Sequence, residues 1–429
     1  MQPLGSNHLD RFAALIGLDW SDGKHDICLQ AADSREREPL LIEHTPEAID
    51  EWARRLRRRF AGRPVAIALE LAKGPIVSAL RKYDFIVLFP INPATLSKYR
   101  EVFTHSGAKD DPSDAQLALD FLLKFAEKLQ PLSPQSPQMR ALEQLVEMRR
   151  RLVDDQTRIT NRLTSALKNY FPQPLQWFED KDSLLFCDFL ERWPTLKAAR
   201  QARRATLERF FREHNVRQPQ LIERRIEAIK NARALTNDEG VIEPFALLVK
   251  ALVEQLRATI HAVESFDREI AARAPAHPDF QIFDSLPAAG PVFAPRLLTA
   301  FGEQRERYPS AADLQRYAGV APVTERSGNS KWVHWRWSCP TFLRQTFVEW
   351  AALTIPRSFW AFAFYRKQRA AGKTHQAALR ALAYKWIRIV HRCWQTRQSY
   401  DEARYLNALK TRGSSLLNFM AAEANAATA

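Results

Sequence analysis

Short apolar runs separated by helical patterns occupy the first part of the chain. The first three runs lie close together and predict an antiparallel meander. The later runs are separated by the amphipathic segments "PEAIDEWARRLRRRF" and "GPIVSALRKY", which predict helical crossovers between parallel strands. This alternation is typical of an α/β domain whose sheet is covered by helices. The predicted strands are residues 13–18, 25–31, 40–44, 65–69 and 85–89.

The hydrophobic period changes after "PLSPQSPQ", residues 131–138, a segment rich in Pro, Ser and Gln that predicts a domain boundary. A long helix with coiled-coil spacing follows, and a second is predicted from about residue 244 to residue 273. Shorter helices are predicted between them, over residues 175–236. Two arrangements suit the long helices: a hairpin within one chain, or an arm that joins two chains. The first seam contains Leu142, Leu145, Leu152, Ile159, Leu163, Ala166 and Tyr170.

A third region begins where "APAHPDF" ends the second long helix, and basic, aromatic helices are predicted from there to about Lys410. The pattern therefore predicts an α/β domain over residues 1–133, a helical coiled-coil domain over 134–274 and a mostly helical domain over 275–429. The predicted fold class is α/β plus all-α.

Composition narrows the function. Lys and Arg number 63 against 49 Asp and Glu, a net charge of +14 that favours a polyanionic partner, and 46% hydrophobic residues exclude a disordered chain. No run approaches the roughly 18 to 20 uncharged residues that cross a bilayer, and no secretory signal is present. The four cysteines form no CxxC pair, so a reducing compartment fits best. We expect a cytoplasmic protein that binds nucleic acid.

Four acids are candidate metal ligands. Asp19 and Glu70 each end a predicted strand, a position that faces the ligand crevice in open α/β sheets. Asp111 and Asp114 are three residues apart near the start of a predicted helix and share one face of it. If the four converge, their repulsion requires a divalent cation, and oxygen ligands select Mg²⁺ or Mn²⁺. Alternatively, Asp111 and Asp114 only cap their helix, and Lys109 beside them binds a phosphate or is a solvated charge.

Two loop segments are candidate contacts to nucleic acid. Gly290, in "LPAAGPVFAPRLL", leads into a helix whose free amides suit a phosphate, although an ordinary helical packing unit has the same pattern. In "VTERSGNSK", Gly328 gives the backbone freedom and Ser327 is a candidate nucleophile between Arg326 and Lys331. Most serines of this kind are plain loop residues, and no nearby His and Asp form a triad.

Tryptophans and cations alternate after this loop. Seven of the eleven tryptophans follow residue 331, and Trp332, Trp335 and Trp337 alternate with Lys331 and Arg336. Aromatic rings suit base stacking and cations suit phosphates, which indicates a nucleic-acid surface. Core packing is the alternative, and it is the interpretation favoured for Trp350 and Trp386.

The ordered segments "GLDWSDGKHDICL", "ALELAKGP", "INPATLSKYR" and "AKDDPSDAQLAL" resemble the N-terminal half of DEDD-type transposases of insertion sequences. The segments "LPAAGPVFAPRLLTAFGE" and "LQRYAGVAPVTERSG" resemble the C-terminal domain of the same family. The family segment after the serine is often rich in Gly and Arg, whereas this chain is rich in Trp there. Agreement at both ends of the chain is more specific than any single motif.

This resemblance implies a RuvC-like, ribonuclease H-like N-terminal domain whose four acids match Asp19, Glu70, Asp111 and Asp114. It implies that Ser327 is the nucleophile of a C-terminal transposase domain. It also implies a structured noncoding guide RNA, the bridge RNA, which pairs with donor and target double-stranded DNA. The family resemblance further implies a homo-oligomer, dimer or tetramer, in which the acids of one subunit can meet the serine of another.

Three hypotheses follow. The first is a Mg²⁺-dependent, RNA-guided DNA recombinase that forms a covalent phosphoserine and associates with the nucleoid when bound to DNA. The second is a metal-dependent resolvase or nuclease that hydrolyses DNA with the carboxylates alone. The third is a scaffold without enzymatic activity, which is disfavoured because clustered acids in a basic protein are costly without a cation.

Overall fold

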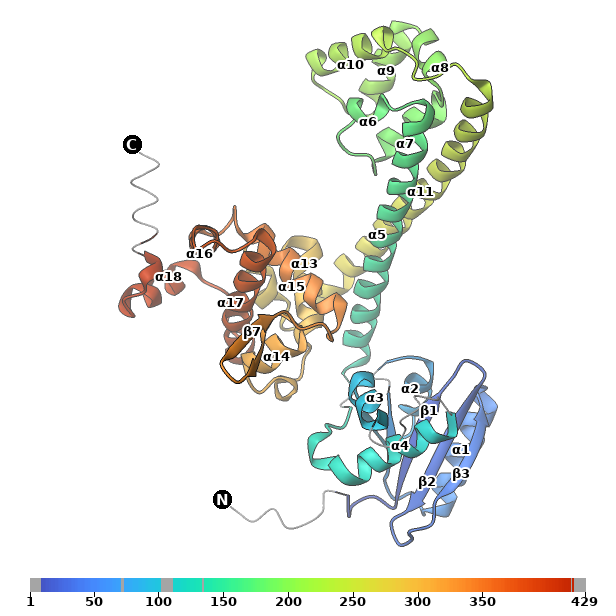
Figure 1. Cartoon of the computed structure of the whole chain (residues 1–429), viewed down its shortest axis with the longest axis vertical. Helices are drawn as coiled ribbons and strands as arrows, with labels where there is room; N and C mark the ends of the chain where they lie inside the picture. The colour runs from blue at the N-terminus through green and yellow to red at the C-terminus, as the bar shows by residue number, and fades with distance from the viewer. Residues whose placement is uncertain (1–8, 71–72, 102–110, 133–134, 418, 420–429) are drawn as a thin grey trace. The chain divides into compact units, whose positions relative to one another are not determined.

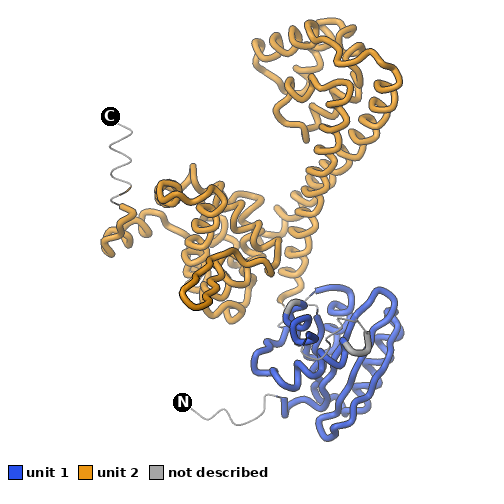
Figure 2. Tube along the Cα trace, viewed as in Figure 1, with its two compact units in different colours: residues 1–134 blue, residues 135–429 orange. Residues whose placement is uncertain are grey.

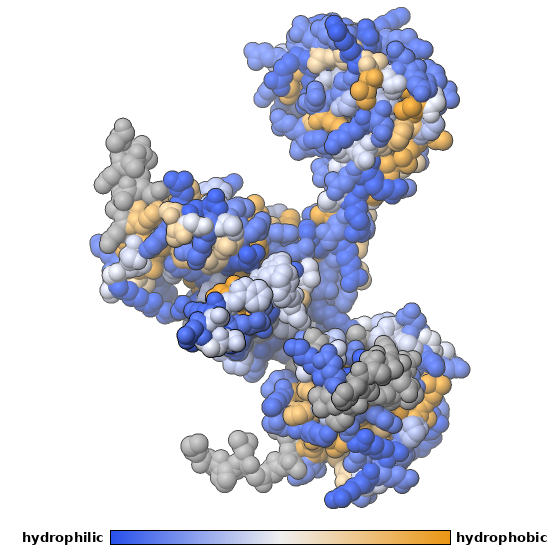
Figure 3. Space-filling model, in the orientation of Figure 1, coloured by the Kyte–Doolittle hydropathy of each residue, from blue (hydrophilic) through white to orange (hydrophobic). Residues whose placement is uncertain are grey.

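The computed structural model describes residues 9–70, 73–101, 111–132, 135–417 and 419. The chain divides into two compact units, residues 1–134 and residues 135–429 (Figure 2). Hydrophilic residues cover most of the surface visible in Figure 3, with smaller hydrophobic patches between them. No helix among the described residues has the length and apolar character that a membrane span requires.

Unit 1 is built on a five-stranded mixed sheet of order β3-β2-β1-β4-β5 (Figure 1). Strands β1, β2 and β3 are antiparallel neighbours, and β1, β4 and β5 are parallel. The predicted meander and the predicted parallel crossovers are both confirmed. The bounds are Ala14–Trp20 (β1), Lys24–Ala31 (β2), Glu38–Glu43 (β3), Val65–Leu69 (β4) and Ile86–Pro90 (β5).

Helices cover both faces of this sheet. Trp52 of α1 and Leu80 of α2 pack with Ile16 and Ile67 in one core, while Leu119 of α4 packs in a second core on the opposite face. Apolar residues on both faces explain why β1 and β4 are continuous hydrophobic runs. The helices are Pro46–Arg59 (α1), Pro75–Leu80 (α2), Pro93–Glu101 (α3), Asp111–Phe125 (α4) and the 3₁₀ turn Ala126–Lys128 (η1).

Two long helices, Pro137–Tyr170 (α5) and Glu239–Arg273 (α11), pack along each other within unit 2 (Figure 1). Arg149 of α5 donates to both carboxylate oxygens of Asp267 in α11, at 2.5 and 3.0 Å. The chain therefore forms the hairpin that was one of the two predicted arrangements, while coiled-coil packing stays a prediction. The predicted start of the second helix was too late, because the Asp238 side chain accepts from the amide of Gly240 and caps the helix earlier.

A cluster of short helices with its own apolar core joins the far ends of α5 and α11. Phe186, Phe189, Phe210 and Phe211 are fully buried there. The prediction of several short helices in this part is confirmed. They are Pro174–Trp177 (α6), Leu184–Arg192 (α7), Leu196–Gln201 (α8), Arg204–Glu213 (α9) and Pro219–Asn231 (α10).

The rest of unit 2 packs around a core rich in tryptophan. Trp350, Trp360, Trp386 and Trp394 are fully buried, which confirms the core interpretation of Trp350 and Trp386. The elements are Ala274–Ala276 (η2), Phe280–Asp284 (α12), Gly290–Phe301 (α13), Arg305–Arg307 (η3), Ala311–Tyr317 (α14), Val323–Ser327 (β6), Ser330–His334 (β7), Thr341–Thr354 (α15), Phe359–Ala370 (α16), His375–Thr396 (α17) and Glu402–Thr411 (α18). The C-terminal core of unit 2 also contains Met139, Leu142, Val146 and Ile270 of the two long helices, and the three-domain organisation stays a prediction.

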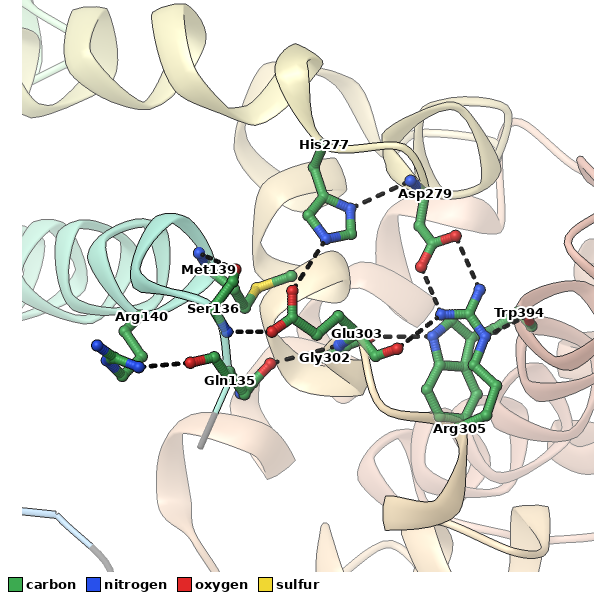
Figure 4. Close-up of polar contacts among 10 residues, drawn as sticks. All are labelled: Gln135, Ser136, Met139, Arg140, His277, Asp279, Gly302, Glu303, Arg305 and Trp394. Carbon is green, nitrogen blue, oxygen red and sulfur yellow. Dashed lines mark hydrogen bonds and ion pairs between the residues drawn. The ribbon is translucent and has the colours of Figure 1, made fainter. Parts of the chain in front are cut away.

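A polar cluster attaches the start of α5 to this C-terminal core (Figure 4). The Glu303 carboxylate accepts from the amide of Ser136, the residue that caps α5. Arg305 donates to both carboxylate oxygens of buried Asp279, at 2.5 and 2.8 Å. Gly302 has φ +73°, and a Cβ there would meet the Gln135 side chain at 2.7 Å. These contacts hold the first turn of the long helix next to the domain boundary.

Candidate active site

Two predicted carboxylates are next to each other at the carboxyl ends of neighbouring parallel strands. Asp19 lies near the end of β1, and Glu70 directly follows β4. Leu18 pairs with Leu69 at the end of the register of these strands, and the next residue along the chain from each is one of the acids. Both acids therefore lie at the carboxyl ends of adjacent strands, where open α/β sheets bind ligands, and their role in a site stays a prediction.

Strand alternation defines the face on which these acids lie. Asp19 points to the same face as Gly17, where a Cβ would clash with the backbone of Ala115 in α4. Glu70 directly follows β4, whose Ala68 packs in the core that α4 covers. The Asp19 carboxylate therefore lies on the α4 face, and Glu70 lies at the carboxyl end of the neighbouring strand. Sequence analysis missed the role of Gly17, which allows the helix to approach the strand closely.

A second carboxylate on this face was also missed. Asp26 on β2 is the direct register partner of Asp19, and opposed residues in an antiparallel pair point to the same face. Like charges in direct opposition destabilise a pair of strands unless another group compensates them. The signal was present in "GKHDICL", where alternation puts Asp26 on the side of buried Cys28. Asp26 lies within its strand, whereas Asp19 and Glu70 were predicted because they lie near strand ends.

The buried acid of α4 has a basic partner. The Asp114 side chain is only 4% exposed and forms an ion pair with Arg100 of α3. A carboxylate buried to this extent needs a compensating charge, and the guanidinium supplies one. The segment "INPATLSKYR", which ends in Arg100, was one of those that carried the family resemblance. Its chemical connection to Asp114 is visible only in the tertiary structure.

The remaining predicted residues of this site are only partly described. The backbone of Asp111 begins α4, and its side chain lies outside the described residues, as does the whole of Lys109. Among the described side chains, no three of His, Cys, Asp or Glu converge closely enough to hold a metal ion. The donor chemistry of Asp19 and Glu70 nevertheless fits a hard cation, because both offer only carboxylate oxygens.

The candidate nucleophile lies at the tip of a β-hairpin. Ser327 and Ser330 form the closing pair of β6 and β7, and Gly328 and Asn329 form the turn between them. Gly328 has φ +55°, as the first central position of a type II′ turn requires. The expected polar loop was wrong in this detail, because Ser327 ends a strand. Its exposure at a turn agrees with the expectation, and its side chain is accessible to solvent.

The neighbours of Ser327 on the hairpin are charged. Arg326 and Lys331 form the next pair and are exposed on the opposite face. His334 lies four residues from the Ser327 pair, roughly 13 Å along the strand. Its ring nitrogens contact the Glu325 carboxylate at 3.0 Å and the Trp335 carbonyl oxygen at 2.8 Å. The hairpin therefore contains no Ser-His pair of the protease type, as expected.

The tryptophans near the hairpin fall into two groups. Trp332 and Trp337 are 57% and 65% exposed. Trp335 instead contacts the guanidinium groups of Arg344 and Arg380, whose Cζ atoms lie 5.0 and 5.2 Å from its ring centroid. Burial, and then the like charge of Arg344, lowers the pKa of Arg380. Trp335 therefore has a structural role, and Trp332 and Trp337 are the ones accessible to a ligand.

The second predicted phosphate contact lies at the start of α13. Gly290 is exposed, with φ +50°, and a Cβ there would meet no atom within 4 Å. This position is open to solvent, as a backbone contact to a phosphate requires. Arg336 is partly buried near the hairpin. The roles of both in binding nucleic acid stay predictions.

Comparisons with known proteins match both ends of the chain to transposase families. Residues 16–172 match the IS110 DEDD family, described as Transposase, and residues 280–366 match the Transposase IS116/IS110/IS902 family. A Streptomyces coelicolor protein named for the mini-circle transposase of IS117 is 28% identical over 415 residues, covering 92% of this chain and 97% of that protein. The insertion element IS110 43.6 kDa protein of the same organism is 28% identical, over 66% of this chain and 70% of its own length.

Proposed function

Because the chain belongs to the IS110-type family of DEDD transposases, we propose that it cuts and exchanges DNA strands through a covalent phosphoserine. The observation that carries the proposal is the register of β1 and β4, whose last pair, Leu18 and Leu69, directly precedes Asp19 and Glu70. The exposed Ser327 hydroxyl at a tight turn supports the covalent step.

In this proposal Asp19, Glu70, Asp111 and Asp114 hold Mg²⁺ or Mn²⁺. A bound divalent ion supplies Lewis-acid chemistry, polarising the phosphoryl oxygen of the scissile phosphodiester. The four carboxylates would hold that ion through their oxygen atoms. In the absence of the ion, the Arg100 guanidinium compensates the negative charge of Asp114. The fold can therefore tolerate this buried acid.

The proposed chemistry conserves the phosphodiester bond. The Ser327 oxygen attacks phosphorus, its proton passes to solvent, and the bond from phosphorus to one deoxyribose oxygen breaks. That oxygen leaves as a hydroxyl after taking a proton from solvent. A hydroxyl from the other DNA then attacks the phosphoserine, which joins the new strands and releases Ser327. No external energy source is needed because each broken bond is replaced by an equivalent one.

Guidance by a structured RNA and action as a homo-oligomer, dimer or tetramer, are part of the proposal. The charge of +14 supports simultaneous binding of RNA and DNA. Lys109, Gly290, Arg326, Gly328, Lys331 and Arg336 are the proposed contacts to nucleic acid. Sequencing the RNA that copurifies with the protein tests the guide: RNA complementary to two DNA segments supports it, and RNA without such segments contradicts it.

A denaturing gel tests the covalent step. The protein is incubated with its copurified RNA, donor and target DNA and Mg²⁺, and we expect protein-linked DNA that resists denaturation. The adduct disappears in Ser327→Ala and is retained in the matched control Ser330→Ala, because Ser330 is the exposed register partner of Ser327. Persistence of the adduct in Ser327→Ala contradicts the assignment of the nucleophile.

The carboxylates are tested in the same assay. Asp19→Asn is expected to abolish both adduct and cleavage, whereas Asp33→Asn, an exposed acid in the turn after β2, leaves both unchanged. If Ser327→Ala still cleaves DNA and Asp19→Asn does not, the carboxylates hydrolyse DNA without a serine intermediate. That result replaces the proposed recombinase with a resolvase or nuclease.

A further inference from the structure

The Ser327 hydroxyl shares one face of its hairpin with a large aromatic ring. Glu325 pairs with Trp332 in the hairpin register, and Ser327 pairs with Ser330. Alternate residues of a strand point to the same face, so Trp332 lies on the face of Ser327. Two residues along a strand correspond to about 7 Å. The ring is therefore close to the hydroxyl but does not cover it.

Trp332 is supported from within the hairpin and remains open to solvent. Its ring stacks on that of His334, with centroids 4.3 Å apart and planes at 26°. His334 is held in turn by the Glu325 carboxylate and the Trp335 carbonyl oxygen. The residue nevertheless stays 57% exposed, which is unusual for a tryptophan with a stacking partner. This arrangement orients an aromatic surface without burying it.

Charge around the hairpin favours a nucleic-acid strand over an apolar partner. The exposed side chains of Arg326 and Lys331 lie on the opposite face, within one residue pair of Ser327. Glu325 is an acid on the Trp332 face, and its carboxylate lies 3.0 Å from the ring nitrogen Nε2 of His334. A strand that crosses the tip can therefore contact cations with its phosphates and an aromatic ring with a base.

We propose that Trp332 is a stacking platform for one unpaired DNA base adjacent to the phosphodiester that Ser327 attacks. The base must be unpaired, because neighbouring bases cover both of its faces inside a duplex. The occupant is DNA because Trp332 lies on the face of the Ser327 hydroxyl, two residues beyond its cross-strand partner Ser330, and that hydroxyl acts on DNA in the proposed function, on which this inference rests. Trp332 acts as a positioning residue: it holds the strand and takes no part in bond making.

A fluorescent base tests the platform without requiring cleavage. The probe is a duplex with a short unpaired bubble that contains 2-aminopurine, whose emission falls when it stacks on an aromatic ring. We expect quenching by the full-length protein and by Ser327→Ala, and its loss in Trp332→Leu. Binding of the bubble is expected to weaken about 5- to 100-fold in Trp332→Leu, the range of one lost base stack. Trp332→Tyr is expected to retain most of the quenching and most of the affinity for the bubble.

Controls separate the platform from general binding and from the chemistry. Phe359→Leu removes another exposed aromatic residue of unit 2 and is expected to leave quenching unchanged. Unchanged quenching in Trp332→Leu overturns the inference, as does quenching of an unpaired RNA loop but not of the DNA bubble. If the protein quenches the 2-aminopurine emission of the DNA bubble as expected, but no protein variant forms a phosphoserine adduct, the stacking role of Trp332 stands. The proposed covalent step then fails.

Discussion

The carboxylate face of unit 1 and the serine hairpin of unit 2 are built in opposite ways. Asp19 and Glu70 extend from strands buried on both faces, and α4 approaches β1 so closely that only glycine fits at residue 17. Ser327 extends from a two-stranded ribbon whose residues are mostly exposed. The acids are therefore positioned by core packing, and the serine by a local turn. Substitutions that disturb packing beside the acids should therefore destabilise unit 1. Substitutions in the serine hairpin should reduce activity on DNA and leave unit 2 folded.

The largest effect is expected for Gly17→Val. The new side chain would clash with the backbone of Ala115, and backbone cannot move aside as a flexible side chain does. We expect the free energy of unfolding of unit 1 to fall by roughly 3 kcal/mol or more, measured by urea denaturation of the full chain. Gly23→Ala is the matched control, because a Cβ at Gly23 meets no atom within 4 Å. Equal stability of the two variants would show that α4 does not restrict β1.

Acid should weaken unit 1 through His25. This side chain is fully buried and lies 2.9 Å from His44, and burial, followed by the charge of His44, lowers its pKa to about 4. Between about pH 6.5 and 4 the unfolded state binds more protons than the folded state, so stability falls as the pH falls. The expected loss is about 3 kcal/mol.

Urea denaturation at several pH values measures this loss. His25→Gln is expected to have a smaller pH dependence over that window, whereas His214→Gln, in the short-helix cluster of unit 2, should retain it. A pH dependence of the same size in His25→Gln would assign the effect to other groups.

A moderate effect is expected for Gly328→Val. A β-branched residue at φ +55° costs about 1 to 2 kcal/mol. Because the hairpin is exposed, this strain should open the turn and leave the core of unit 2 folded. Hydrogen exchange of the hairpin amides is expected to become faster while the urea midpoint of unit 2 stays the same. A shift of that midpoint would show that the hairpin is part of the core.

The smallest effect on stability is expected for Ser327→Ala. Its side chain is exposed at the tip of the hairpin, so the free energy of unfolding should change by less than about 0.5 kcal/mol. The same substitution is expected to abolish the DNA adduct. Gly17→Val is thus expected to lower stability strongly, whereas Ser327→Ala is expected to remove the DNA adduct without lowering stability. A marked loss of stability in Ser327→Ala would mean that the hydroxyl has a structural role.

The sheet could be predicted because its strands are strongly apolar and separated by clear helical signals. The hairpin could not, because Val323–Ser327 and Ser330–His334 are mostly polar and exposed, and their apolar residues do not alternate with polar ones. Asp26 and Arg100 were missed for a different reason. Their importance depends on a strand register and an ion pair between segments distant in the sequence. Local alternation indicates the face on which Asp26 lies, but it does not show that Asp19 is opposite Asp26 or that Arg100 pairs with Asp114.

The amino-acid sequence alone determined the order of strands and helices in unit 1, the basic character of the chain and the family segments at its two ends. Each of these follows from local hydrophobic periodicity or from residue identity, which need no contact between distant segments. Tertiary structure alone decided that Asp19 and Asp26 share the α4 face, that Asp114 pairs with Arg100, and that Trp332 lies on the face of Ser327. These relations depend on strand register and helix packing, which bring together residues that the sequence separates.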